Sequence, residues 1–431
     1  MPSSIHASKL MAKRLQQISY SLSTVCIITI IVLLLAGLVP ATTNAWAPSR
    51  IDGTNESVGD KDKDKDKDKD KDKDKDKDKD KDKDGDDGNG NGDGNGDGED
   101  GTYDINLYVI NYFPLTEDGL LDADITGEEF LTGLSHQEIR QRTDDITNNM
   151  VYFIGEATTY LGYTDPDDID PSTSAGEPSL NYHIVDTIEI LEPVPVNPDS
   201  PIADYPDYMH MLTEDVNVCD LVDNQGVDEI LIWAYQGFPE TRLQISESKM
   251  SSEFGDISNS PRLDDMPDCD NTYIVYTYNY AREVTEAIHA WGHQIEAEMS
   301  EIDPVLFRDL WQGPNYPATL DVDGRCGSVH NAPNARFEYD SFNPEPHRSD
   351  CLDWNPVGVL GALSGISCEN WGCNDISDTD NSGLNYHVWN WQNLPGLGND
   401  KEYQGEQLRN WWDVHGDWDN VMANDRSLTV N

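Results

Sequence analysis

The chain has 431 residues, of which 82 are aspartate or glutamate and 29 are lysine or arginine, giving a formal net charge of −53 at pH 7. From Thr102 onward, 61 acidic residues face two lysines and eleven arginines, a net charge of −48 in 330 residues. No basic patch exists to neutralise phosphates, which excludes nucleic acid as a partner. Salt screens self-repulsion of this size, so the acidity fits a saline surrounding or a surface loaded with divalent cations.

Residues 1–47 have the pattern of an export signal. Three basic residues precede a mainly apolar run from Val25 to Val39, and Ala45-Trp46-Ala47 offers a small-residue cleavage site. Fifteen residues rise about 23 Å as a helix, which is short of a hydrocarbon core of about 30 Å. A membrane anchor, lengthened by flanking residues, is the alternative. In both cases we expect an extracellular protein, secreted or anchored to the outer face of the cell membrane by the N-terminal segment alone.

Residues 48–101 have the composition of a disordered spacer. Twelve Lys-Asp repeats run from Lys61 to Asp84, and a Gly/Asn/Asp stretch follows to Gly101. Neither segment has apolar surface to bury, so we expect both to hold the folded part away from the cell surface. The segments 93–98 and 378–383 each match the start of a calcium loop, the first within a low-complexity tract and the second without an acidic closing residue. A calcium ion is therefore left open, with no assigned position.

The folded part is expected to begin near Tyr103 and to have an α+β fold. Runs rich in β-forming residues predict strands at 105–112, 182–191, 228–235 and 271–278. Apolar residues at helical spacing predict a long helix through 139–161, between the first two strands, and another helix at 282–300. This order predicts an α+β or three-layer arrangement with a mixed sheet. We assign residues 102–303 to this core.

Residues 304–431 are rich in Pro, Gly, Asn and Asp and contain four of the seven cysteines. Because Cys26 lies in the apolar run, an even number remains: Cys219, Cys269, Cys326, Cys351, Cys368 and Cys373. Six cysteines in an exported chain favour up to three disulfides, and among the 15 possible pairings Cys368 and Cys373 are close enough to close one loop. With a final helix predicted at 406–423, we expect a loop-rich, disulfide-stapled C-terminal part packed on the core.

The helix predicted at 282–300 separates apolar from titratable residues. Five apolar residues form one stripe at about 100° per residue: Val284, Ile288, Trp291, Ile295 and Met299. Five polar residues cluster opposite: Arg282, Glu286, His289, His293 and Glu296. A glycine in the helix interior, Gly292, costs about 1 kcal/mol relative to alanine, which suggests close approach by another segment. The alternative is a solvated polar face, which charged residues opposite an apolar stripe usually form.

His289 and His293 are one helical turn apart and can bind one metal ion. They match the first and fifth positions of the H-E-x-x-H signature of metalloproteases, but Ala290 replaces the glutamate that acts as general base. We therefore predict a site for zinc or another divalent transition metal, with Glu296 or His330 as the third ligand. Glu286, one turn before His289, is the candidate catalytic base.

Three other histidines are candidates with alternatives. His330 follows Cys326 in a Gly-containing loop that could be pinned over the helix, or it could simply hydrogen-bond to backbone. His387 and His415 lie among tryptophans and are weaker candidates. Five tryptophans of the C-terminal part could stack on sugar rings, although packing in a loop-rich core is the better explanation: Trp389, Trp391, Trp411, Trp412 and Trp418.

Several short motifs, in order along the chain, resemble a family of exported microbial proteins without an assigned activity. The motifs are Val227–Trp233, Glu247–Met250, Asn279–Arg282, His289–Glu296, Cys326–His330, Trp389–Gly396 and Trp411–Trp412. The resemblance covers most of Tyr103–Asn424. The strand–helix–strand opening before a histidine-bearing helix is also similar, more faintly, to zincin metallopeptidases, and Ala290 then implies an altered mechanism or a scaffold that has lost catalysis.

These observations predict an exported or surface-tethered metal-dependent hydrolase, zincin-like, with a peptidase as the nearest reaction class. Its partner would be an unknown extracellular protein or polysaccharide. The alternative is a non-catalytic module for cell-surface adhesion or glycan binding. In that case the His/Glu face is a structural network, and exposed tryptophans bind the ligand.

Overall fold

The computed structural model describes residues 101–127, 131, 133–163, 176–200, 205–235, 247–260, 262, 264–313, 325–354, 364–373, 383–424 and 426–430. The predicted export signal, the Lys-Asp spacer and nearly all of both calcium-loop matches lie outside these residues. Within them, no helix combines the length and the apolar character needed to cross a membrane.

A six-stranded mixed sheet with the strand order β2-β1-β3-β6-β4-β5 forms the centre of the fold. β1 (Tyr103–Tyr112) pairs in parallel with β2 (Leu180–Ile190) and β3 (Glu229–Ala234), and β3 pairs in parallel with β6 (Tyr273–Asn279). β4 (Glu247–Ser251) runs antiparallel to β6 and to β5 (Ile257–Ser258). The predicted α+β class with a mixed sheet is confirmed, and each of the four predicted strands is present with ends shifted by one or two residues.

Helices and short strands surround this sheet along the chain. In the first part they are α2 (Ala123–Thr126), α3 (His136–Ala157), α4 (Tyr208–His210), η2 (Met211–Asp215), α5 (Val218–Gln225) and α6 (Val284–Ile302). In the C-terminal part they are η3 (Val305–Gln312), β7 (His347–Ser349), η4 (Cys351–Asp353), β8 (Ser364–Ile366), η5 (Cys368–Asn370), α7 (Leu384–Gln392), β9 (Glu402–Tyr403), β10 (Glu406–Gln407), α8 (Trp412–Gly416) and α9 (Trp418–Asn424).

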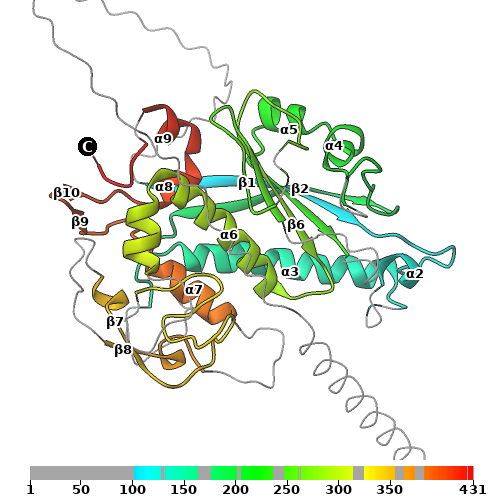
Figure 1. The fold of residues 1–431 in the computed structure, drawn as a ribbon. Coiled ribbons are helices and arrows are strands. Elements are labelled where there is room, and N and C mark those ends of the chain that lie inside the picture. The colour runs from blue at the N-terminus through cyan, green and yellow to red at the C-terminus, as the bar shows by residue number, and fades with distance from the viewer. Residues whose placement is uncertain are drawn as a thin grey trace, which may run out of the picture. The chain divides into compact units, whose positions relative to one another are not determined.

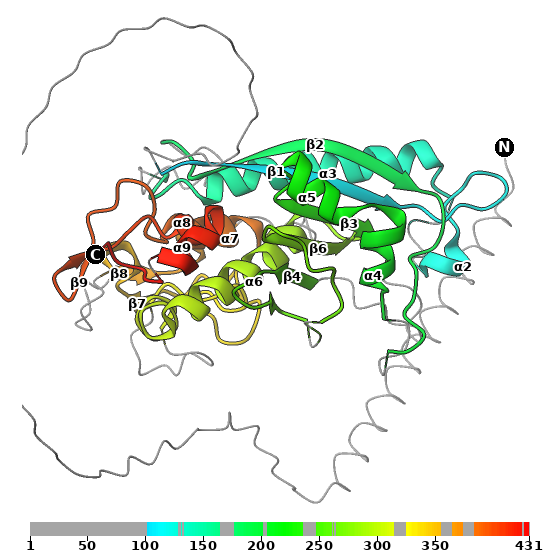
Figure 2. The same ribbon diagram turned by 90° about the horizontal axis from the view of Figure 1, so that it is seen from above.

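Both faces of the sheet are covered, because successive side chains of a strand point to opposite faces. On β6, Tyr278 packs on Trp233 of β3, whose indole Nε1 donates to Thr147 of α3 at 2.7 Å. The preceding residue of β6, Thr277, points to the opposite face and forms a hydrogen bond of 2.9 Å with Tyr208 of α4. Figures 1 and 2 show α3 and α6 on one side of the sheet and α4 and α5 on the other. The fold is a three-layer arrangement.

Local sequence signals explain where α3 begins and ends. Ser135 caps its start, and the side chain of Glu138 returns to the backbone of Ser135 in a capping box. The predicted apolar residues from Ile139 to Ala157 are buried against the sheet and α6. Leu161, predicted as the last of this series, instead lies beyond the helix with φ of 47° and is partly exposed.

The predicted final helix at 406–423 is wrong in extent, because β10 and two short helices occupy this region. The helix α8 ends at Gly416, where an added Cβ would lie 2.3 Å from the ring of Tyr103. Any residue with a side chain at this position would collide with β1. All five tryptophans considered as sugar-stacking faces are buried, with at most 4% of their surface exposed. The packing interpretation is therefore confirmed for them.

Six cysteines form three disulfides: Cys219–Cys269, Cys326–Cys351 and Cys368–Cys373. The pairing of Cys368 with Cys373 is the loop closure expected from their spacing. The first bond joins α5 to the segment before β6. The other two lie in the C-terminal part, where β7 and β8 are short and disulfides replace regular structure as cross-links.

A buried ionic network fixes the inner face of α6 to the sheet. His415 of α8 lies between two carboxylates, with Nδ1 at 2.9 Å from Glu298 of α6 and Nε2 at 3.0 Å from Glu229 of β3. The hydroxyl of Tyr182 on β2 donates to Glu229 at 3.1 Å and accepts a hydrogen bond from Trp291 of α6 at 3.1 Å. Beneath the apolar stripe, α6 is thus tied to two strands and to α8.

Candidate metal centre

Three histidine side chains meet on the outer face of α6. The Nε2 atom of His293 lies 3.0 Å from Nε2 of His289 and 3.0 Å from Nε2 of His330. The rings of His289 and His330 are nearly parallel, with centroids 5.0 Å apart, and His293 stands at right angles to both. The three nitrogens form a group that could hold a metal ion.

The contacts around His293 determine which of its nitrogens has a free lone pair. Its Nδ1 lies 3.1 Å from a carboxylate oxygen of Glu296, which can only accept, so Nδ1 carries the proton. Nε2 of His293 then carries a lone pair and faces two other imidazole nitrogens. One cation between them would engage all three lone pairs. A tetrahedral zinc ion with bonds of about 2.0–2.1 Å separates its nitrogens by about 3.3 Å, so each of the two 3.0 Å contacts of His293 would need to lengthen by only a few tenths of an ångström.

Burial favours the neutral form of His289 and His330. Desolvation lowers the pKa of His289 far below its usual value, and the nearby His387, His293 and His330 lower it further. The pKa of His330 is lowered chiefly by burial and secondly by His293, while Glu296 and Glu338 oppose the shift. Neutral imidazoles are the form that binds metal ions.

Glu296 organises the site without facing the three Nε2 atoms. One of its oxygens accepts from His293 Nδ1, and the other accepts from Gln312 of η3 at 2.6 Å and from the backbone N–H of Val329 at 3.1 Å. A carboxylate on the far nitrogen of a metal-binding histidine fixes its tautomer and ring orientation. Of the two residues predicted as alternatives for a third ligand, the structure therefore brings His330 to the histidine pair and places Glu296 behind it.

The loop from Cys326 to Asn331 carries His330 onto α6. At Gly292, an added Cβ would lie 2.6 Å from a methyl group of Val329 and 3.0 Å from the ring of Trp391. The glycine that is costly in the helix is therefore what lets the loop approach. Gly327 adopts φ of 83°, and a Cβ there would lie 2.4 Å from the carbonyl oxygen of Asn331. Both glycines are required by contacts that set the position of His330.

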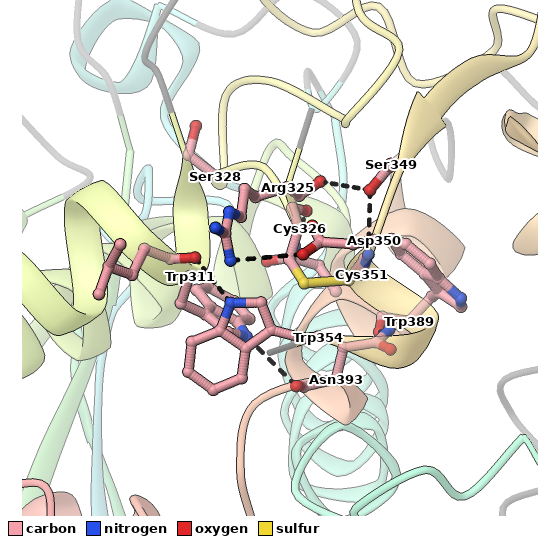
Figure 3. The surroundings of a disulfide bond; sticks show 12 residues. Trp311, Arg325, Cys326, Ser328, Ser349, Asp350, Cys351, Trp354, Trp389 and Asn393 are labelled. Atoms are coloured by element: carbon pink, nitrogen blue, oxygen red, sulfur yellow. Dashed lines mark hydrogen bonds and ion pairs between the residues drawn. A yellow bond between two sulfur atoms is a disulfide. The ribbon is translucent and has the colours of Figure 1, made fainter. Parts of the chain in front are cut away.

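A disulfide and buried polar contacts support the base of this loop (Figure 3). Cys326 is bonded to Cys351, and its backbone N–H donates to Trp311 O at 3.0 Å. The buried side chains of Arg325 and Asp350 form an ion pair at 3.4 Å beside the disulfide. The loop that presents His330 is thus held to η3 and to the segment after β7.

Two residues at the site carried little or no signal in the sequence. Tyr339 has a positive φ of 63°, which is rare for an aromatic residue, and its hydroxyl lies 3.2 Å from Nε2 of His330. His387 of α7 is buried, its ring meets that of His289 edge-on at 5.4 Å, and its Nδ1 has no hydrogen-bond partner among the described residues. Burial, followed by His293 and His330, lowers the pKa of His387 to about 3.

The candidate base, Glu286, lies on the same helix face but is engaged elsewhere. Its carboxylate forms an ion pair of 2.6 Å with Arg282, one turn before it, and 43% of its side chain is exposed. Ala290, at the position of the missing glutamate, is buried. In the described part of the chain, the carboxylate that contacts the cluster is that of Glu296.

A second group with metal-binding residue types consists of Cys219, Asp223 and Cys269. The two cysteines are bonded to each other, so their sulfurs are not thiolates. The Asp223 carboxylate accepts instead from the backbone N–H of Asn271 at 3.0 Å. This group therefore has a structural explanation.

No protein-family model, curated protein or solved structure matches the chain. The resemblance to exported microbial proteins and the fainter zincin likeness stay predictions from the sequence motifs.

Replacing Glu296 by Gln is expected to weaken metal binding about 10- to 100-fold, the usual effect of losing such an outer carboxylate. A glutamine has only one side-chain oxygen. Its NH₂ group must face either His293 Nδ1 or the donors of Gln312 and Val329, and the contact on that side is lost. Glu286→Gln, on the same helix face, is the matched control and should retain the affinity. Zinc titration against a competing chelator measures both variants, and equal affinities in the two would contradict the assigned role.

Proposed function

We propose that the protein is an exported metal-dependent hydrolase in which His289, His293 and His330 hold a zinc ion. The convergence of three Nε2 atoms at 3.0 Å contacts is the observation that carries this proposal. Uncompensated lone pairs at this spacing repel one another without a shared proton or cation. Three neutral ligands with an open fourth position are typical of catalytic zinc, whereas structural zinc sites have four protein ligands.

A zinc ion held by these residues would supply Lewis acidity toward a substrate carbonyl and toward water near neutral pH. The chain's own residues would orient the site. Glu296 holds His293 in the ligating tautomer, and Gln312 with the backbone of Val329 holds Glu296. Tyr339, beside His330, offers a hydroxyl that can donate to a substrate oxygen. Because Glu286 is paired with Arg282, we assign it no role in removing a proton, and Ala290 makes the reaction differ from that of H-E-x-x-H enzymes.

Export is the second part of the proposal. It is supported by the N-terminal signal pattern and by three disulfides, since such bonds persist in oxidising compartments. The alternative is an adhesion or glycan-binding module that stacks sugar rings on exposed tryptophans. The five tryptophans considered for this role are buried, so they do not support it.

Hydrolysis tests the proposal directly. Zinc-loaded protein in high salt should cleave p-nitrophenyl acetate and denatured protein, lose this activity with 1,10-phenanthroline, and regain it with added zinc. Zinc-loaded protein that cleaves no ester and no peptide would contradict the hydrolase and favour a binding module.

A further inference from the structure

A cleft of about 330 Å³ lies along α6 and η3, beside two of the three clustered histidines. His293 and His330 line one end, and Ser300 and Arg308 line it further along. Ser300 lies seven residues beyond His293 on α6, which is two turns or about 10 Å along the helix axis. The cleft is therefore long enough for a small molecule or a few peptide residues to reach from the cluster to Arg308.

Two contacts, one turn apart, join α6 to η3 along this cleft. Gln312 of η3 donates to Glu296 of α6, and Arg308 of η3 donates through Nε to Oγ of Ser300 at 2.7 Å. The two helices run antiparallel here, so the two contacts lie side by side along the cleft. The first contact, between Gln312 and Glu296, orients the histidine cluster. The second holds a guanidinium group at the cleft, and its Nη atoms have no hydrogen-bond partner among the described residues.

Arg308 differs from most of the described arginines in this acidic protein. Seven described arginines form ion pairs with carboxylates: Arg140, Arg142, Arg262, Arg282, Arg325, Arg336 and Arg426. Within the described part of the chain, the contact of Arg308 is with the neutral hydroxyl of Ser300. Glu301, next to Ser300 in the sequence, forms an ion pair with Arg426. Glu296, which also lines the cleft, accepts hydrogen bonds from three other donors. Because Arg308 contacts no carboxylate among the described residues, its guanidinium group can bind an anionic ligand.

We infer that the cleft takes substrates carrying an anionic oxygen group, a carboxylate or a phosphate, bound by Arg308 about 10 Å from the bond that is cleaved. This inference rests on the proposed function, because it places the reacting bond at the histidine cluster. Guanidinium groups bind such anions through two parallel hydrogen bonds. Arg308 is a specificity residue in this account, because it binds the substrate away from the reacting atoms.

Hydroxamates that bind zinc at one end and carry different groups at the other end test the inference without knowledge of the natural substrate. Suberic acid monohydroxamate has a length comparable to the distance between His293 and Arg308. We expect zinc-loaded full-length protein to bind it about 10- to 100-fold more tightly than its methyl ester, which corresponds to one charge-assisted hydrogen-bonded contact. The short acetohydroxamate gives the affinity of the zinc end alone. A chain of the same length that ends in a phosphonate distinguishes phosphate from carboxylate as the preferred group.

In Arg308→Gln the advantage of the acid over the ester should vanish, while acetohydroxamate binding and zinc content stay unchanged. Arg308→Lys should retain part of the advantage, and Arg426→Gln, an exposed arginine outside the cleft, should retain all of it. Equal binding of acid, phosphonate and ester to the wild-type protein, with acetohydroxamate still bound, would overturn the inference and leave the metal centre intact. Failure to bind both zinc and acetohydroxamate would overturn the inference together with the proposed function.

Discussion

Replacing His415 by Ala should lower the free energy of unfolding by about 3–5 kcal/mol, because it leaves two buried carboxylates without their cation. The side chains of His415, Glu229 and Glu298 have at most 2% of their surface exposed. For a domain of this size the thermal midpoint should fall on the order of 10 °C. His183→Ala, which removes an exposed histidine paired with Asp104, is the control and should have little effect.

The pH dependence of this effect has a defined sign. Burial alone would lower the pKa of His415, but Glu298 and Glu229 outweigh it and raise the pKa to about 10. The unfolded chain has a histidine pKa of about 6.5, so the folded state holds the extra proton between these values. The stability that His415 contributes is complete below about pH 6.5 and is lost as the pH rises toward about 10. Denaturant unfolding should therefore show the gap between wild type and His415→Ala narrowing over this range. A gap that is constant or widens would contradict an imidazolium at this position.

Replacing His293 by Ala should have the largest effect on metal binding. His293 is the ligand that contacts both other histidines and is oriented by Glu296. Zinc sites contribute about 10–16 kcal/mol over all their ligands, so one lost imidazole should reduce the affinity by two to three orders of magnitude. Competition with a chromophoric chelator measures this loss.

The fold should survive this substitution, because 23% of the His293 side chain is exposed and the buried stripe of α6 is untouched. Near-ultraviolet circular dichroism can verify that. His210→Ala, a half-exposed histidine 3.8 Å from Asp215, should keep the wild-type affinity. If His293→Ala binds zinc as the wild type does, or if it unfolds the protein, the cluster is not a metal centre.

The sequence predicts the class of fold because its periodicities are long and regular. The strands β1, β3 and β6 and the helices α3 and α6 bury apolar residues along most of their length, and the spacing of these residues is visible in the sequence. The C-terminal part is different, since its short elements depend on disulfides and on contacts made far along the chain. Residue 416 must be a glycine because Tyr103 lies against it, which no local pattern can indicate.

The site is predicted most directly where its residues share one helix. His289, His293 and Glu296 fall on one face of α6, so spacing alone brings them together. The separate roles of Glu296 and His330 depend on how a loop 33 to 37 residues away lies across Gly292. Gln312 and Tyr339 reach the cluster through tertiary packing, and for them residue type and spacing give no indication. His387 is only a weak candidate from the sequence, because nothing in its local pattern shows that its ring meets that of His289.

Metal content of the wild-type protein tests the central claim most directly. The full chain, purified in its oxidised form in high salt without chelators, would be analysed by inductively coupled plasma mass spectrometry. The account predicts about one zinc ion per chain, as expected for a site built from three imidazoles. Folded protein that contains no transition metal and takes up none from added zinc would contradict it.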